Sequence, residues 1–227
     1  PYMDNYNYQK GMKAIIQELK NFLKRKDIGT DSDRALLLDF QATLEIKPEK
    51  AIKLEKDALA QIENITADNA RLVSNLHANL GGLYRMNGHP DLAREHMEKS
   101  ISLLDQFNLL HINDSIPQIA NYAMFLTEQQ EPERGISELQ KLSGIIKEYH
   151  SDDCLDYAKV QETLGTIYLM TANLPQAKTH FKRAFKIYEK IWADEPEMIE
   201  AKYQEIQELY PQIGFCIGKN LSGLLTK

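Results

Sequence analysis

The chain has 227 residues, of which 43% are hydrophobic and 26% charged, so we expect one folded domain or a short repeat array rather than a disordered chain. Its formal net charge of −6 argues against nucleic acid or an anionic membrane as the partner, because both would repel it at long range. No stretch approaches the roughly 18 apolar residues of a membrane span.

Apolar residues recur at intervals of three and four along most of the chain, which is typical of amphipathic helices. In chain order the pattern predicts helices over residues 5–25, 32–46, 49–63, 68–87, 91–107, 116–129, 133–149, 153–171, 175–192, 196–209 and 212–225. Turn signals separate the helices at Asn87-Gly88-His89-Pro90, Glu131-Pro132 and Asn173-Leu174-Pro175. Proline stops one helix and is tolerated in the first turn of the next. No segment shows a convincing strand pattern.

Two segments repeat the same order of residues. Leu80-Gly81-Gly82-Leu83-Tyr84 is followed by Ala93, Met97 and Ser100, and Leu164-Gly165-Thr166-Ile167-Tyr168 by Ala177, Phe181 and Ala184. Gly81 and Gly165 are 84 residues apart, which is twice 42, and the other positions keep this offset. A middle copy falls in register at Tyr122, Ala123, Leu126, Gly135, Leu139 and Leu142, and a looser first copy at Leu38, Ala42, Ala51 and Ala58. The small residues are expected where two helices cross closely.

This period divides the chain into six segments of one continuous solenoid domain. We predict the second helix of a truncated preceding repeat over residues 1–30 and a degenerate repeat over 31–73. Three repeats follow over 74–115, 116–157 and 158–199, with degenerate capping helices over 200–227. The first segment opens at Pro1, and its Tyr8, Gly11 and Ile15 look like the start of a second helix. We therefore expect the sequence to be a piece of a longer array.

The order Leu-Gly-x-x-Tyr, eight residues, Ala, three residues, Phe, two residues, Ala resembles the tetratricopeptide repeat signature. The usual repeat has about 34 residues, and Asp105 and Glu189 stand where the usual closing proline would be. The longer form resembles the repeats of the kinesin light chain and of helical sensor domains in bacterial peptide-receptor regulators. The resemblance implies an all-α, tetratricopeptide-like α–α superhelix, a solenoid of antiparallel helix pairs, that binds a protein or a peptide and catalyses no reaction.

Catalytic, metal and cofactor sites are not indicated. No two histidines have the i, i+4 spacing of a zinc-binding helix, and we interpret all six as surface residues: His77, His89, His96, His111, His150 and His180. Gly81-Gly82 lies inside a predicted helix and is better explained by helix packing than by phosphate binding. The two cysteines, Cys154 and Cys216, favour a reducing, cytoplasmic compartment and are interpreted as small packing residues. Asp152-Asp153 is expected in a first helical turn.

The resemblance places candidate peptide-binding residues on the concave face, which the first helix of each pair lines. They are Asn75, Asn79, Arg85 and Met86 in one repeat, Asn121, Met124 and Glu128 in the next, and Lys159, Glu162 and Thr166 in the third. Asn79 and Asn121 are 42 residues apart, and an amide side chain can both donate to and accept from a peptide backbone. The alternative, which we weigh equally, is that each Asn bonds a neighbouring helix. Leu36 and Phe40 stand where a carboxylate-binding Lys/Asn clamp would be, so binding of a chaperone tail is not expected.

Three functions stay open at this point. The chain is a protein- or peptide-binding module of a larger signalling or regulatory protein, with its ligand in the concave groove. Alternatively, it is a structural array that self-associates, as a homodimer, through its degenerate last helices at 196–225. The third alternative is an accessory domain of an enzyme whose catalytic part is missing.

Overall fold

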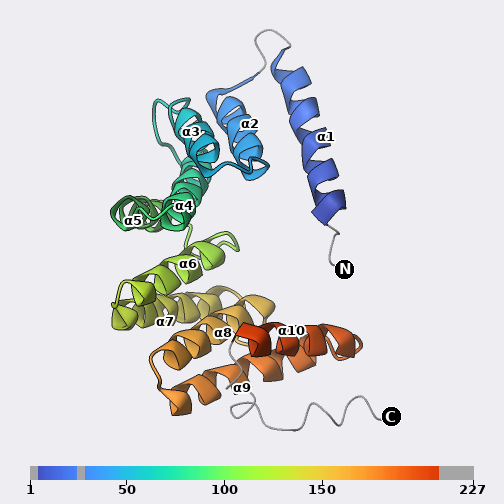
Figure 1. Cartoon of the computed structure of the whole chain (residues 1–227), viewed down its shortest axis with the longest axis vertical. Helices are drawn as coiled ribbons and strands as arrows, with labels where there is room; N and C mark the ends of the chain where they lie inside the picture. Colours follow the sequence, from blue (N-terminus) through green and yellow to red (C-terminus); the bar gives the residue numbers. More distant parts are fainter. Residues whose placement is uncertain (1–4, 25–28, 210–227) are drawn as a thin grey trace. The chain divides into compact units, whose positions relative to one another are not determined.

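A computed structural model of the chain describes residues 5–24 and 29–209, and 78% of the structure is helical with no strand among these residues (Figure 1). The helices are α1 (Asn5–Leu23), α2 (Asp31–Thr43), α3 (Pro48–Leu59), α4 (Ala70–Met86), α5 (Pro90–Gln106), α6 (Ser115–Glu128), α7 (Pro132–Tyr149), α8 (Leu155–Met170), α9 (Leu174–Ile191) and α10 (Pro196–Leu209). The all-helical fold is confirmed, and these ten helices match the predicted ones closely. The predicted helix 212–225 lies outside the described residues.

The helices form antiparallel pairs within two units, which are described separately. Unit 1 spans residues 1–109 and unit 2 spans residues 110–227. In unit 1, α2 packs on α3 and α4 on α5, and in unit 2, α6 packs on α7 and α8 on α9. We call α2, α4, α6, α8 and α10 first helices, and α3, α5, α7 and α9 second helices. First helices also contact each other, α2 with α4 and α6 with α8, and their shared surface in each unit is called the first-helix face.

Small residues lie where the two helices of a pair cross, as predicted. Ala93 and Ala177 have no exposed surface. A Cβ atom added to Gly81 would lie 2.5 Å from Met97 Cγ, and one added to Gly165 would lie 3.0 Å from the Phe181 ring. These large apolar side chains of the second helix fill the space that the glycines leave, so the small–large pairing is part of the packing. By contrast, a Cβ added to Gly82 would meet nothing within 4 Å.

The turn inside each pair repeats at the 42-residue period. Gly88, Gln130 and Ala172 have positive φ angles of 75°, 64° and 59°. Each turn is closed by a hydrogen bond from the next residue to a carbonyl five residues back: His89 N to Tyr84 O at 2.9 Å, Glu131 N to Leu126 O at 2.8 Å, and Asn173 N to Tyr168 O at 2.8 Å. This is a helix C-terminal motif with a left-handed residue, which favours glycine. The predicted register is therefore visible in the backbone itself.

Two helices begin two residues later than predicted, at 155 in place of 153 and at 70 in place of 68. Helix α8 begins at Leu155, and its N-cap is Cys154, whose sulfur accepts a hydrogen bond from the Tyr157 N–H at 3.4 Å. The half-exposed Cys154 is thus a capping residue and not a packing residue, because the orphan amides of a first turn need an acceptor. Asp153 lies before the cap and pairs with Lys190 on α9. Helix α4 begins at Ala70, after a turn in which Thr66 N donates to Asn69 Oδ1 at 2.8 Å. Cys216 lies outside the described residues.

Candidate functional site: the first-helix faces

In unit 2 the candidate residues form two stripes on neighbouring helices. Asn121, Met124 and Glu128 follow each other at intervals of three and four along α6, and Lys159, Glu162 and Thr166 do the same along α8. Residues at this spacing share one side of a helix, and α6 and α8 are in contact. Asn121, Glu128 and Lys159 are exposed, whereas Met124, Glu162 and Thr166 are half-buried.

Glu162 belongs to a hydrogen-bond network that joins three helices of unit 2. Its carboxylate accepts a bond from the Tyr188 hydroxyl on α9 at 2.5 Å and one from Lys202 Nζ on α10 at 3.2 Å. Burial, together with the charge of Glu162, raises the pKa of Tyr188 well above its ordinary value. Burial alone would lower the pKa of Lys202, but the charges of Glu162 and Glu205 raise it overall. Glu162 is therefore tied to the fold and contributes little free acceptor capacity to a ligand.

Two further candidates in unit 2, Lys159 and Thr166, have partners on their own helix. Lys159 forms a loose ion pair with Asp156 at 3.6 Å, and the Thr166 hydroxyl donates to the backbone carbonyl of Glu162 at 3.1 Å. The Asn121 amide makes no hydrogen bond to any residue that the structure describes. An exposed amide without an intramolecular partner keeps both its donor and its acceptor capacity. Asn121 is thus the side chain of this face that is best disposed toward a peptide backbone.

In unit 1 the equivalent amide has intramolecular partners. Asn79 Nδ2 donates to Asp39 Oδ1 on α2 at 2.8 Å and to Glu55 Oε1 on α3 at 3.2 Å. Asn79 itself is exposed, so the bonded group lies at the surface of the first-helix face. The two amides that share one repeat position therefore differ in their surroundings. Whether either binds a ligand stays a prediction.

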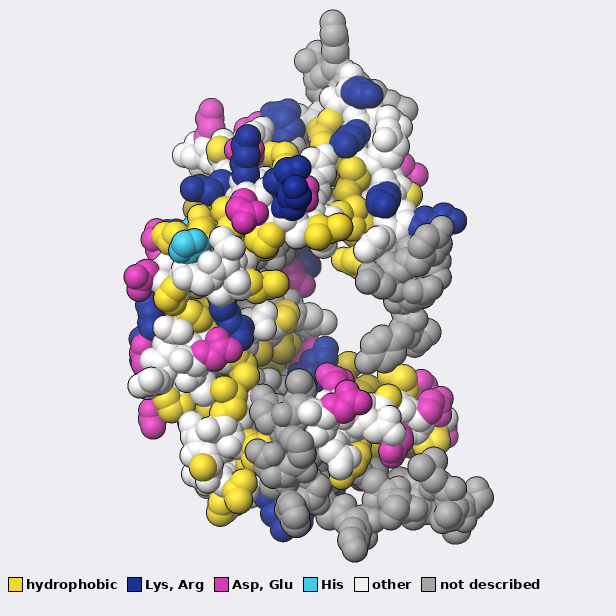
Figure 2. All heavy atoms as spheres, viewed as in Figure 1, with side chains coloured by type: hydrophobic (Ala, Val, Ile, Leu, Met, Phe, Trp, Pro, Cys, Tyr) yellow, Lys and Arg dark blue, Asp and Glu magenta, His cyan; other side chains and the backbone are white. Residues whose placement is uncertain are grey.

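The remaining unit 1 candidates also lie on α4. Met86 ends the helix with 82% of its surface exposed, and Asn75 and Arg85 are half-buried. Asn75, Asn79 and Met86 share the side of the helix that continues the spacing seen in unit 2. On the face of the molecule drawn in Figure 2, apolar side chains lie in small groups among charged ones.

Four of the six histidines are half-buried, contrary to the sequence-based interpretation: His77, His96, His180, and His111, whose ring stacks on Tyr149 with centroids 4.8 Å apart. His77 Nδ1 and His96 Nδ1 lie 2.8 Å apart, and Tyr84 stacks on His96 with ring centroids 5.4 Å apart. In unit 2, His180 Nδ1 lies 2.9 Å from Gln161 Oε1, and Tyr168 stacks on His180 at 5.3 Å. The two groups are related by 84 residues, twice the repeat period. Burial lowers the pKa of His77, His96 and His180, that of His77 to about 4 with a further contribution from His96.

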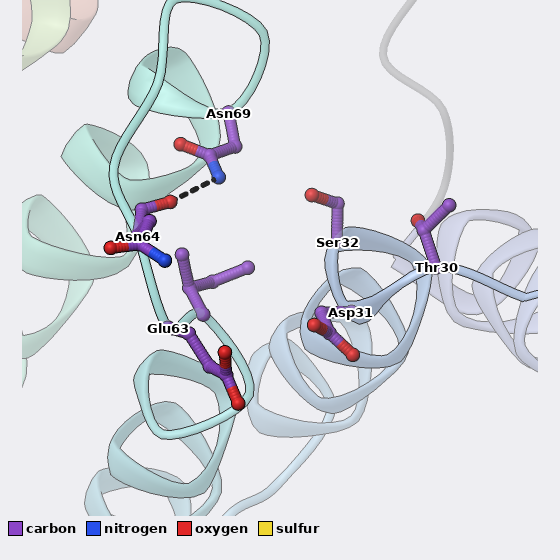
Figure 3. A pocket seen from close by; sticks show the side chains of 7 residues that line it. Thr30, Asp31, Ser32, Glu63, Asn64 and Asn69 are labelled. Carbon is purple, nitrogen blue, oxygen red and sulfur yellow. Dashed lines mark hydrogen bonds between the residues drawn. The ribbon is translucent and has the colours of Figure 1, made fainter.

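Described residues line a surface pocket in each unit. In unit 1 a pocket of about 270 Å³ lies between the start of α2 and the α3–α4 connection, lined by Thr30, Asp31, Ser32, Ile62, Glu63, Asn64 and Asn69 (Figure 3). Its polar groups already serve the local turns: Thr30 bonds Asp33 in a capping box, and Asn69 donates to the Asn64 carbonyl at 2.9 Å. The pocket is therefore explained by capping.

The pocket of unit 2 has a volume of about 420 Å³ and was not indicated by the sequence. Residues of α7 and of the α8–α9 turn line it, namely Pro132, Glu133, Ile136, Ser137, Gln140, Tyr168, Thr171 and Asn173. The tyrosine that stacks on His180 thus also forms one wall of this pocket. Across residues 5–24 and 29–209, no three His, Cys, Asp or Glu side chains are grouped to hold a metal ion. Over the same part of the chain, no helix is both long and apolar enough to cross a membrane.

Comparisons with known proteins agree with this architecture. Residues 115–190 match a family model described as tetratricopeptide repeat. The helix pairs of this segment, with a small residue at each crossing, have the structure that the match requires. Residues 115–190 are therefore assigned to the tetratricopeptide repeat family. No curated protein matches the chain.

Several solved structures share the fold at low sequence identity. BtubC (BKLC) from P. vanneervenii has a TM-score of 0.68 at 18% identity, covering 90% of this chain and 82% of that one. A putative kinesin light chain from Podosopora anserina with nearly identical TPR-like repeats has a TM-score of 0.62 at 14% identity, covering 81% and 90%. MamA has a TM-score of 0.54 at 16% identity, covering 84% and 98%. At these identities the likeness concerns the fold alone.

Proposed function

We propose that the chain is a non-catalytic, cytoplasmic scaffold module that holds a peptide or a segment of another protein on its first-helix faces. The tetratricopeptide fold suggests a protein-interaction scaffold, and the detail of peptide binding is our proposal. The observation that carries it is the exposed Asn121 amide on α6, beside Met124 and Glu128 on α6 and Lys159 on the adjacent helix α8.

The chemistry of this face suits an extended or amphipathic segment. The Asn121 amide can donate to a backbone carbonyl and accept from a backbone N–H at once. Met124 offers an adaptable apolar contact, and Glu128 and Lys159 present opposite charges that would select among ligand side chains. In unit 1, Asn79, Arg85 and Met86 lie on α4, where the Asn79 amide nitrogen already donates to Asp39 and Glu55.

The experiment compares binding by the wild-type chain and by two single variants. Proteins retained by the immobilised chain are identified, and each is titrated against wild type, Asn121→Ala and Asn113→Ala. Asn113 is an exposed Asn in the connection before α6 and serves as the matched control. Loss of one backbone hydrogen bond should weaken binding about two- to tenfold in Asn121→Ala only. Equal binding by all three chains for every retained partner would place the binding surface elsewhere. Self-association through 196–225, which extends beyond the described residues, stays a separate prediction.

A further inference from the structure

One repeat carries two carboxyl groups at positions that are apolar in the other repeats. Asp39 on α2 and Glu55 on α3 occupy the register positions of Gly81 and Met97, 42 residues later. The same two positions hold Ala123 and Leu139, and Gly165 and Phe181, in the next repeats. Gly81 packs against Met97 and Gly165 against Phe181 where the two helices cross, and Ala123 and Leu139 are both fully buried. Packing of the pair therefore does not require the acids of the first repeat.

The two acids meet beneath the Asn79 amide, on the first-helix face of unit 1. Glu55 is only 2% exposed, and its Oε1 accepts a bond from Asn79 at 3.2 Å, whereas its Oε2 has no hydrogen-bond partner. Asp39 is half-buried and accepts a hydrogen bond from Asn79 at 2.8 Å, so one carboxyl group of the pair is partly accessible to solvent. Asp39 is therefore the carboxyl group of the pair that solvent reaches on the first-helix face, and Glu55 is the buried one.

Within residues 5–24 and 29–209, this group has no positively charged partner. Among the described residues, no Lys, Arg or His forms an ion pair with Asp39 or Glu55. Of the two helices packed against α3, α2 contributes Asp39 and α4 contributes the neutral Asn79. Burial and the Asp39 charge raise the pKa of Glu55 to about 9, and burial raises that of Asp39. Two adjacent carboxyl groups do not both ionise when they are buried, so the pair keeps one proton. A bound cation could supply the same positive charge in its place.

We propose that Asp39, Glu55 and Asn79 form a subsite that binds the ammonium or guanidinium group of a Lys or Arg side chain of the partner. The inference rests on the proposed function and specifies the ligand chemistry in unit 1. The incoming cation takes the place of the shared proton, which leaves to solvent, while Asp39 and Glu55 accept its N–H donors. Asn79 keeps the two carboxylates in position with its own two donors.

The test uses the full chain and a pair of small probes that differ in charge alone. N-acetyl-lysine methylamide is added at millimolar concentration while the side-chain carboxyl ¹³C resonance of Glu55 is followed against pH. The norleucine analogue, which lacks the ammonium group, is the matched control. We expect the lysine probe to lower the pKa of Glu55 by about one unit or more, because an opposite charge favours the ionised form. The norleucine probe should leave it unchanged.

Two variants test whether the lysine probe acts at Asp39 and Glu55. Asp39→Asn removes the carboxylate nearest to solvent and should abolish the response to the lysine probe, while circular dichroism reports whether the helices are retained. Glu55→Gln keeps the shape of the side chain and should remove proton release, so that lysine affinity no longer rises about tenfold per pH unit below the Glu55 pKa. An equal response to lysine and norleucine, or no response to lysine up to its solubility, overturns the proposal.

Other outcomes separate this subsite from alternatives. If Mg²⁺ or Ca²⁺ lowers the Glu55 pKa and the lysine probe does not, the group binds a metal and the proposal is wrong. The Asn121→Ala experiment concerns unit 2 and is read independently. A partner that depends on Asn121 but shows no preference for Lys or Arg at the Asp39 subsite would overturn this inference and leave the proposed function intact.

Discussion

His77 on α4 and His96 on α5 face each other through their Nδ1 atoms, which lie 2.8 Å apart across one helix pair. One ring must donate and the other accept, so at least one is neutral. Because burial lowers the pKa of His77 to about 4, the folded chain binds fewer protons than the unfolded chain between pH 4 and the ordinary histidine value of about 6.5. The free energy of unfolding should therefore fall as the pH is lowered through this window.

The variant His77→Gln should reduce this acid sensitivity. It reproduces the Gln161–His180 pair of unit 2, in which a protonated histidine can still donate to an amide oxygen. We expect the loss of stability between pH 7 and 4.5 to be about 1 kcal/mol smaller in the variant than in wild type. Urea unfolding at several pH values measures it, with exposed His89→Gln as the control. Identical pH profiles for His77→Gln and wild type would contradict the prediction.

Glu55 should give the opposite pH dependence. Its pKa of about 9 in the folded chain lies far above its ordinary value of 4.5, so the folded chain holds a proton that the unfolded chain releases. Stability should then fall as the pH rises from 4.5 to 9. Glu55→Gln removes this ionisation and should stabilise the chain by about 1–3 kcal/mol at pH 8, with almost no effect near pH 4.5. Denaturant midpoints of the variant and of exposed Glu49→Gln, compared at both pH values, decide the matter.

The left-handed turn residues predict a stabilising substitution. Ala172 has a φ of 59° at the position that Gly88 occupies with 75°, and a left-handed conformation costs a residue with a Cβ roughly 1–2 kcal/mol. After the larger backbone entropy that glycine loses on folding, Ala172→Gly should still stabilise by about 0.5–1 kcal/mol. Gly88→Ala should destabilise by a similar amount. Thermal midpoints measured for both variants should move in opposite directions, and shifts of the same sign would be inconsistent with this explanation.

Enlarging a small crossing residue should weaken a helix pair. Ala177 is fully buried where α8 and α9 cross, so the additional atoms of a leucine side chain would have to displace neighbouring groups. Ala177→Leu should destabilise the fold by about 1–3 kcal/mol, because overpacking forces strained rotamers or backbone shifts. The same substitution at exposed Ala193 is the control. An unchanged urea midpoint for Ala177→Leu would show that the crossing is looser than the structure indicates.

The sequence predicted the helices and the register because both depend on a pattern of apolar and small residues. Gly81 and Phe181 show that pattern directly, and their neighbours follow at fixed offsets. The turns were predicted from proline and Gly88, but nothing in Gln130 or Ala172 indicates a positive φ, since the surrounding helices impose it. Helix starts at Ala70 and Leu155 were missed because their caps depend on local geometry.

The polar side chains were harder to predict. Which partner an exposed amide finds depends on side chains brought close by packing, and Asn79 meets acids from two helices that precede it by 24 and 40 residues. The 42-residue repeat did contain two signals of these polar groups. Asp39 and Glu55 occupy positions that are apolar in the repeats over 74–199, and His96 and His180 occupy the same repeat position. Both become visible only when the chain is aligned with itself and the exceptions are examined.

The turns at Gln130 and Ala172 have nearly the same backbone geometry, so the number of helix pairs in the array could be changed by joining one turn to the other. If residues 131–172 were removed, Gln130 would be followed by Asn173, and the new junction would have the backbone geometry that both turns already share. Helix α9 would then pair with α6 in place of α7. The exchange needs one adjustment: Gly135 is pressed so closely on Ala123 that a Cβ would lie 2.6 Å from its carbonyl oxygen, so Ala177, its counterpart, would have to become glycine. Such a chain would gain or lose first-helix surface in whole 42-residue blocks, at a junction whose backbone geometry already occurs in the chain.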